Sequence, residues 1–279
     1  MNKTTLKLLL KDLVSSLSLK KLRKYRVSTE YQSYGAALED ADGYEDEILT
    51  EIIIGKGKKF AKELADNKEV DLNSLRAFIG ISSAIKSSAL KVIDFGGAAG
   101  THYYLAKAIL SQDVAIDWRV VETGQMVKEA KEQGLETDEL SFYDSINAAT
   151  QGERFDLVFA SSSIHYTPNP YEILKELTKI KANKLVVTRT PITDKTMVLL
   201  QRSSLSANGT GAIPKEWAIK DKVISYPATM LEKNKVEEIF KLFGDITLKI
   251  REDKAAYVSL SSTYDMWGYV VSKQMQDNE

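Results

Sequence analysis

Residues 91–104 place an acid and three glycines directly after a short apolar run. The apolar residues predict a strand that ends beside Asp94, and the residues after Gly100 predict a helix. Gly96, Gly97 and Gly100 allow a tight turn that a ligand can approach closely, and the start of the helix offers unpaired N–H groups. A strand, a glycine-rich turn and a helix in this order are typical of sites that bind a nucleotide cofactor.

The acid at Asp94 helps to distinguish between nucleotide cofactors. A dinucleotide would place its pyrophosphate on the turn, where a nearby carboxylate would repel it. A cofactor with a cationic amino-acid group would be attracted, and S-adenosylmethionine (SAM) carries both an ammonium and a sulfonium. We therefore expect SAM to contact Asp94, Gly96, Gly97, Ala98 and Gly100.

Two further strand ends supply candidate contacts for the adenosyl group. Glu122 ends the predicted strand 118–122, where its carboxylate could accept both ribose hydroxyls. The alternative is a structural salt bridge, and the position just after the glycine turn favours the ribose role. Phe142, Tyr143 and Asp144 end the next strand. An aromatic ring could lie against the adenine and Asp144 could accept from its amino group, or Asp144 could cap the next helix.

The candidate catalytic residues follow the fourth and fifth strands. Ser161 ends the fourth strand at the cofactor, and His165 just beyond it is a candidate general base for the acceptor, or a residue that caps a helix or packs under the loop. His102 lies in the first turn of the glycine-loop helix, where the positive dipole end disfavours protonation, so we assign it to the cofactor side. Arg189 ends the fifth strand and could bind a carboxylate or phosphate of the acceptor, or pair with Glu122 or Asp144.

These motifs together resemble a family of class I SAM-dependent methyltransferases that are often encoded near bacterial surface-polysaccharide genes. The resemblance covers about residues 30–192. It implies methyl transfer from SAM, with Gly96, Gly97, Gly100 and Glu122 as cofactor contacts, and it leaves the acceptor open. Ala98 stands where methyltransferase turns usually have a middle glycine, a replacement that is free of strain if φ is negative there. The matching motifs are Tyr31-Gln32-Ser33-Tyr34-Gly35-Ala36-Ala37, Gly43-Tyr44, Asp94-Phe95-Gly96-Gly97, Trp118-Arg119-Val120-Val121-Glu122, Phe142-Tyr143, Ser161-Ser162-Ser163, Pro170-Tyr171 and Arg189-Thr190-Pro191.

Apolar runs alternate with helical patterns from residue 91 onward, which predicts an α/β fold with a mostly parallel sheet. The short connection before the last strand predicts that this strand runs antiparallel, as in the Rossmann-like class I methyltransferase fold. We expect a helical N-terminal cap over 1–88, a SAM-binding domain over 89–279, and an irregular acceptor-recognition segment over 191–230. The seven predicted strands are 91–95, 118–122, 140–143, 155–160, 184–189, 246–251 and 269–272, and the predicted helices are 102–111, 124–132, 170–181 and 233–243.

Composition excludes several other classes of protein. The 279 residues include no cysteine, which excludes disulfides, Cys-ligated zinc and a thiol nucleophile and is compatible with the cytoplasm. The net charge of -1 gives no bulk reason to bind nucleic acid. Serines rather than carboxylates follow the fourth strand, so we expect no metal ion. No run is long and apolar enough to span a membrane.

The amphipathic segment 1–24 is strongly basic and could dock on a membrane surface or a partner, or simply pack with a solvated basic face. The sequence as a whole favours a metal-free methyltransferase that acts on a hydroxyl of a sugar, glycan precursor or other small molecule. The alternatives are an N-, C- or protein methyltransferase, and a non-catalytic scaffold with a SAM-type fold that docks through residues 1–24.

Overall fold

The computed structural model describes residues 30–41, 47–66, 69–70, 74–86, 88–211, 213, 217, 222–257 and 263–273. The basic segment predicted over 1–24 lies outside the described residues. Within the described ranges, no helix combines the length and apolar character that a membrane crossing requires.

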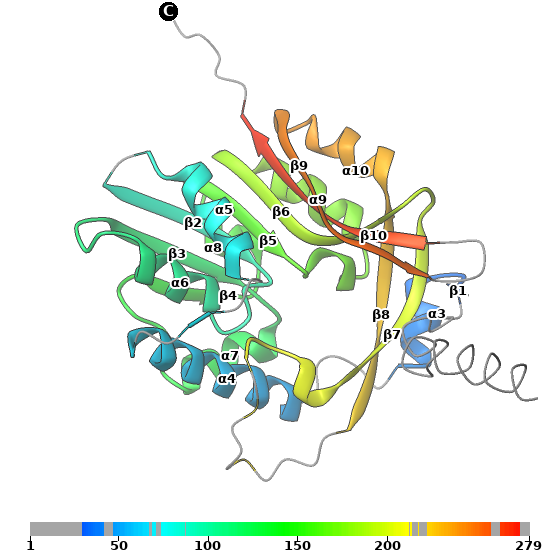
Figure 1. Cartoon of the computed structure of the whole chain (residues 1–279), viewed down its shortest axis with the longest axis horizontal. Helices are drawn as coiled ribbons and strands as arrows, with labels where there is room; N and C mark the ends of the chain where they lie inside the picture. Colours follow the sequence, from blue (N-terminus) through cyan, green and yellow to red (C-terminus); the bar gives the residue numbers. More distant parts are fainter. Residues whose placement is uncertain are drawn as a thin grey trace, which may run out of the picture.

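A central sheet of seven strands runs in the order β4-β3-β2-β5-β6-β10-β9 (Figure 1). The neighbours from β4 to β6 are parallel, and β10 is antiparallel to both β6 and β9. The predicted fold class is therefore confirmed, including its antiparallel last strand. The bounds are β2 Ala89–Phe95, β3 Ala115–Val121, β4 Leu140–Tyr143, β5 Phe155–Ser161, β6 Ala182–Thr193, β9 Asp245–Tyr257 and β10 Thr263–Ser272.

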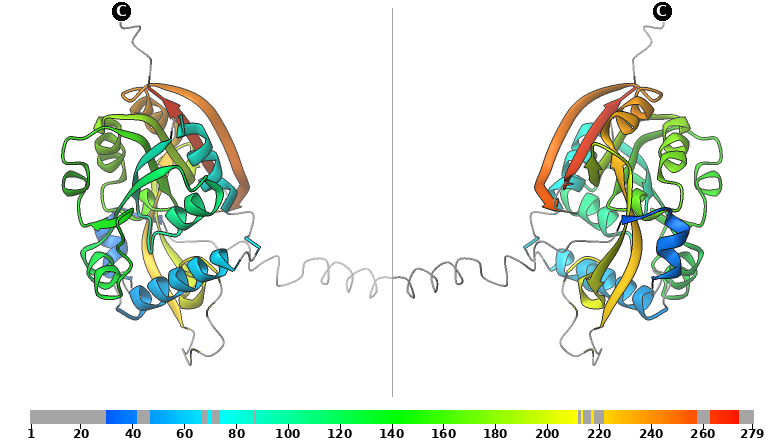
Figure 2. Two further views of the ribbon diagram at one scale, coloured as in Figure 1. Left: turned by 90° about the vertical axis from the view of Figure 1, so that its left-hand side faces the viewer. Right: turned by 90° about the vertical axis from the view of Figure 1, so that its right-hand side faces the viewer.

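Helices cover both faces of this sheet, and β9 and β10 curve along one side of the molecule (Figure 2). One core lies between the sheet and α4 (Glu47–Ala65), α5 (Leu75–Ala84), α6 (Thr101–Ile109) and α7 (Gly124–Glu132). A second core lies between the other face and α8 (Ile146–Thr150), α9 (Pro170–Lys179) and α10 (Lys233–Phe240). Successive side chains of β5 point to opposite faces of the sheet, so Phe159 belongs to the first core and Val158 to the second.

Helices α4 and α5 belong to the first core although they precede the predicted domain boundary. The buried residues Leu49, Ile52, Ile53 and Phe60 place an apolar stripe of α4 against α6 and α7. Gly57 allows this approach, because a Cβ there would lie 2.3 Å from the Cβ of Ala99. The described part of the predicted cap thus contributes one layer of the fold, and the boundary at residue 88 stays a prediction.

Three further strands extend the sheet to ten strands, so the predicted number of seven was too low. Strands β7 (Met197–Ser204) and β8 (Val223–Glu232) form an antiparallel pair, β1 (Glu30–Tyr31) joins β7, and β8 pairs with the end of β6 (Figure 1). The segment 191–230 is therefore partly regular. Pro227 inside β8 cannot donate a ladder hydrogen bond, which is why the pattern around it does not read as a strand.

Candidate functional site

The glycine turn after β2 is built over a buried carboxylate. Asp94 is fully buried, and its Oδ2 accepts from Trp118 Nε1 at 3.1 Å and lies 3.0 Å from His102 Nδ1. A Cβ on Gly97 would lie 2.5 Å from the same oxygen. Asp94 therefore supports the turn from beneath and orients His102, and it does not line the cavity described below.

Glu122 lies directly against the turn, as expected from the two adjacent strand ends. Its Oε1 accepts from Ala98 N at 2.9 Å and its Oε2 accepts from Thr123 N at 3.0 Å. Burial raises the pKa of Glu122, and the two backbone donors oppose this shift. Each carboxylate oxygen keeps a further lone pair for a ligand.

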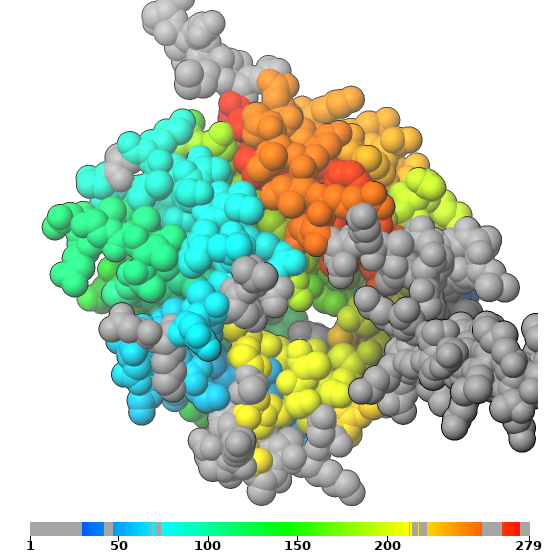
Figure 3. Space-filling model, in the orientation of Figure 1, coloured from blue at the N-terminus to red at the C-terminus, as the bar shows by residue number. Residues whose placement is uncertain are grey.

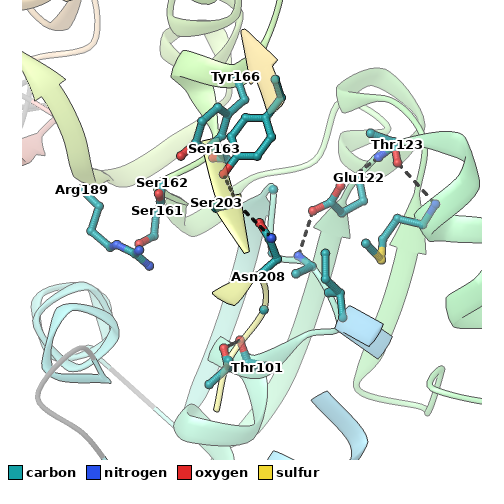
Figure 4. A pocket seen from close by; sticks show the side chains of 18 of the residues that line it. Thr101, Glu122, Thr123, Ser161, Ser162, Ser163, Tyr166, Arg189, Ser203 and Asn208 are labelled. Carbon is teal, nitrogen blue, oxygen red and sulfur yellow. Dashed lines mark hydrogen bonds between the residues drawn. The ribbon is translucent and has the colours of Figure 1, made fainter. Parts of the chain in front are cut away.

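A cavity of about 880 Å³ opens over this turn at the carboxyl ends of the strands. Figure 3 shows the hollow between the cyan residues near 75 and the yellow residues near 205. Figure 4 shows Glu122 and Thr123 on one side of the pocket and Arg189, Ser161 and Ser162 on the other. The predicted site residues that line the cavity are Gly96, Gly97, Ala98, His102, Glu122, Ser161 and Arg189.

The structure does not bring His165, the predicted general base, to the lining of this cavity. Its side chain is 2% exposed, its ring centroid lies 4.0 Å from that of Tyr166, and its Nδ1 has no hydrogen-bond partner among the described residues. Burial, followed by the charge of Arg189, lowers the pKa of His165 to about 3. His165 is therefore a neutral packing residue in this structure, the alternative that the sequence left open.

The predicted adenine contacts also lie outside the cavity. Phe142 is fully buried in the first core, Tyr143 packs against the second core, and Asp144 is exposed. Ser145, not Asp144, caps α8 by accepting from Ala148 N. Thr123 and Met126 line this part of the cavity instead and were missed, because their placement depends on how α7 follows Glu122.

Gly100 has a structural role at the start of α6. It has φ +74°, and a Cβ there would lie 3.0 Å from a methyl group of Leu140. It lies outside the lining of the cavity and starts α6 close to β4. Glycine is required at this position because the backbone is left-handed and because α6 packs closely on β4.

Strained backbone is concentrated at the cavity. Ala98, Ser162 and Arg189 have φ values of 51°, 56° and 53°, and all three line the cavity. The condition for an unstrained alanine at position 98, a negative φ, is therefore not met. Left-handed conformations of residues other than glycine are costly and gather at functional sites.

A hydrogen-bonded wall from β7, β8 and the adjacent 3₁₀ turns closes the cavity opposite the strand ends. Gln201 accepts from Tyr166 Oη and donates to Tyr226 Oη, each at 3.3 Å. Ser203 lies 3.0 Å from Tyr226 Oη and accepts from Asn208 Nδ2 at 3.2 Å (Figure 4). Burial raises the pKa of both tyrosines, so their phenols stay neutral. These residues were missed, since only the pairing of β7 with β8 brings them together.

Lys56 of α4 anchors the end of this wall. Its ammonium donates to the carbonyl oxygens of Ser206, Asn208 and Gly209 at 3.1, 2.6 and 3.2 Å. The side chain is buried, and burial lowers the pKa of Lys56. Asn208 and Gly209 line the cavity, so this contact fixes part of the site to the first core.

No family model matches the sequence, and no curated protein matches it. Three solved structures to which the chain is similar are an S-adenosylmethionine-dependent methyltransferase from Clostridium acetobutylicum ATCC 824, the CcbJ methyltransferase from Streptomyces caelestis and the ribosomal protein L11 methylase from Lactobacillus delbrueckii subsp. bulgaricus. Their identities are 13%, 12% and 14% and their TM-scores 0.45, 0.47 and 0.43. The matches cover 78%, 74% and 74% of this chain and 98%, 97% and 80% of those chains.

Proposed function

We propose that the protein is a SAM-dependent methyltransferase that acts on a hydroxyl of a sugar, glycan precursor or other small molecule. The observation that carries this proposal is the position of Glu122, whose carboxylate lies against the glycine turn and lines the cavity. An acid at this place can accept the two ribose hydroxyls of an adenosyl cofactor.

The residues around the turn fit this cofactor. A Cβ on Gly96 would lie 2.2 Å from the Cβ of Ser163, so only glycine leaves the backbone room beside the β5 loop. Glu122, Thr123 and Met126 would hold the adenosyl group, and Gly96, Gly97 and His102 would hold the methionine end. When bound, SAM supplies an electrophilic methyl group on a sulfonium.

Two features support a small hydroxyl-bearing acceptor. A cavity of about 880 Å³ is of the size that proteins use for small ligands, and its far wall presents the side chains of Gln201, Ser203, Tyr166 and Tyr226. The resemblance to methyltransferases encoded near surface-polysaccharide genes agrees with a sugar or glycan precursor. A nitrogen, carbon or protein acceptor is the alternative, and assays of methyl transfer to such acceptors would detect it.

Catalysis in this proposal depends mainly on how the protein positions the acceptor relative to SAM. His165 is shielded from the cavity, so the protein would act by holding the acceptor oxygen in line with the sulfonium. Arg189, which lines the cavity, would lie near the acceptor. The proposal includes no metal ion.

Calorimetric titration with SAM, S-adenosylhomocysteine (SAH) and NAD tests the cofactor. We expect both adenosyl ligands to bind and NAD not to bind. Glu122→Gln replaces an acceptor oxygen by an amide that faces a backbone donor, so we expect its SAH affinity to fall about 10- to 100-fold. Glu132→Gln, an exposed site on α7, is the matched control and should bind like the wild type.

Absence of SAH binding to the folded wild-type protein would overturn the methyltransferase proposal. Binding of SAH without turnover of any hydroxyl, amino or protein acceptor would favour the scaffold alternative. Docking through residues 1–24 and a cytoplasmic location stay predictions.

A further inference from the structure

Arg189 gives one side of the cavity a positive charge, and no carboxylate lines the cavity on that side among the described residues. Glu122 is the only acid among the described lining residues, and Figure 4 shows it on the side opposite Arg189. Arg76, which also lines the cavity, is paired with Glu252. The guanidinium of Arg189 makes no hydrogen bond or ion pair with any described residue.

A β-bulge in β6 turns Arg189 toward the cavity. Gly268 of β10 alone lies opposite the two residues Thr188 and Arg189, while regular pairing continues on both sides. Bulges re-aim side chains and are common beside active sites. Arg189 also has φ +53°, a strained conformation for a residue with a side chain.

Glu252 stabilises this bulge through the backbone of Arg189 and does not contact the guanidinium of Arg189. Its Oε1 accepts from the backbone N of Arg189 at 2.7 Å, and its Oε2 pairs with Arg76. The Glu252 side chain is 3% exposed, and a Cβ on Gly268 would lie 2.8 Å from Oε1, so glycine makes room for this carboxylate. The backbone of Arg189 is therefore fixed while its charged end is left for a ligand.

The surroundings of Arg189 select the chemistry of that ligand. Ser161 and Ser162 lie beside the guanidinium, and the neutral wall of Gln201, Ser203 and Tyr226 belongs to the same cavity (Figure 4). A guanidinium binds a carboxylate or phosphate in a two-pronged geometry, and hydroxyl and amide side chains bind hydroxyls. We infer that the acceptor is a small molecule with both hydroxyl groups and an anionic group, and that Arg189 binds its carboxylate or phosphate.

This inference rests on the proposed function, and its test begins with SAH binding. Wild-type protein, R189Q, R189K and R202Q are each saturated with SAH and unfolded thermally at constant ionic strength. The probes are inorganic phosphate, D-glucuronate and glucose at millimolar concentration. Arg202 is the matched control, because it is an exposed arginine on β7 outside the cavity lining.

For the wild type and R202Q, we expect phosphate or glucuronate to raise the melting temperature by roughly 2–5 °C. R189Q should lose this gain, R189K should keep part of it because it keeps the charge, and glucose should have no effect on any of them. A larger rise in melting temperature with phosphate would indicate a phosphorylated acceptor, and a larger rise with glucuronate would indicate an acidic sugar.

Equal gains in wild type and R189Q, or no gain from either anion in the wild type, would overturn the inference. SAH binding with either of these results leaves the methyltransferase proposal standing. Failure of SAH itself to bind overturns the proposed function instead.

Discussion

The buried carboxylate of Asp94 explains why glycine occupies position 97. The carboxylate is fixed by Trp118 and His102, and it lies under the turn where a side chain of residue 97 would start. Room for this carboxylate and access for a ligand above it are therefore provided by the same missing Cβ.

Gly97→Ala tests this arrangement. A Cβ 2.5 Å from Asp94 Oδ2 forces the carboxylate or the turn to move, so we expect the free energy of unfolding to fall by about 1–3 kcal/mol and SAH binding to weaken. Urea unfolding and calorimetry measure the two effects. Gly124→Ala is the control: Gly124 is the first residue of α7, nothing lies within 4 Å of its Cβ position, and stability should stay equal or rise slightly. Equal losses in both variants would show that the Asp94 contact is not the cause.

At the scale of elements, Lys56 connects α4 to the loop that ends the cavity wall. Lys56→Met leaves three backbone carbonyls without their donor, so we expect a loss of about 1–3 kcal/mol of unfolding free energy together with weaker SAH binding. Lys62→Met, an exposed lysine on the same helix, controls for the loss of charge and should leave both unchanged. An unchanged SAH affinity in Lys56→Met would show that this anchor does not shape the site.

The sequence predicted correctly those helices and strands whose residues show a clear periodicity of their own. The predicted bounds of α7 and of β4 agree with the structure, because each has a clear periodicity and clear breaks. Strands β7 and β8 were not predicted. Gln201 and Ser203 make the inner face of β7 polar, and Pro227 interrupts the strand pattern of β8. Those polar residues line the cavity, so the apolar alternation that marks a half-buried strand is missing from β7.

The same distinction separates the site residues that were predicted from those that were not. Gly96 and Glu122 follow from the rule that parallel strands end at one edge of a sheet. His165 could not be placed this way, because its burial results from packing of its 3₁₀ turn (Ile164–Tyr166) against β8 and α9. Arg189 was placed at the right edge, but its bulge depends on β10, about 80 residues further on.

At the scale of the whole molecule, β6 joins two parts of the structure. It pairs with β5 and β10 in the central sheet and, at its end, with β8 of the added strands. The turn that carries His165 packs where these parts meet, against β6, β8 and α9. A charge placed on His165 would therefore disturb packing between the two parts and lower the stability of the whole chain.

This placement predicts how stability depends on pH. The pKa of His165 is about 3 in the folded protein and near 6.5 when unfolded, so between these values the unfolded chain binds the extra proton. The residue has no effect above pH 6.5, and below it the free energy of unfolding falls by about 1.4 kcal/mol per pH unit. We expect His165→Phe to remove this pH dependence. Between pH 7 and pH 5, its free energy of unfolding in urea should therefore rise by about 2 kcal/mol relative to that of the wild type. Tyr166→Phe, which removes no group that titrates in this range, should follow the wild-type curve; parallel curves for wild type and His165→Phe would show that His165 takes up its proton in the folded state.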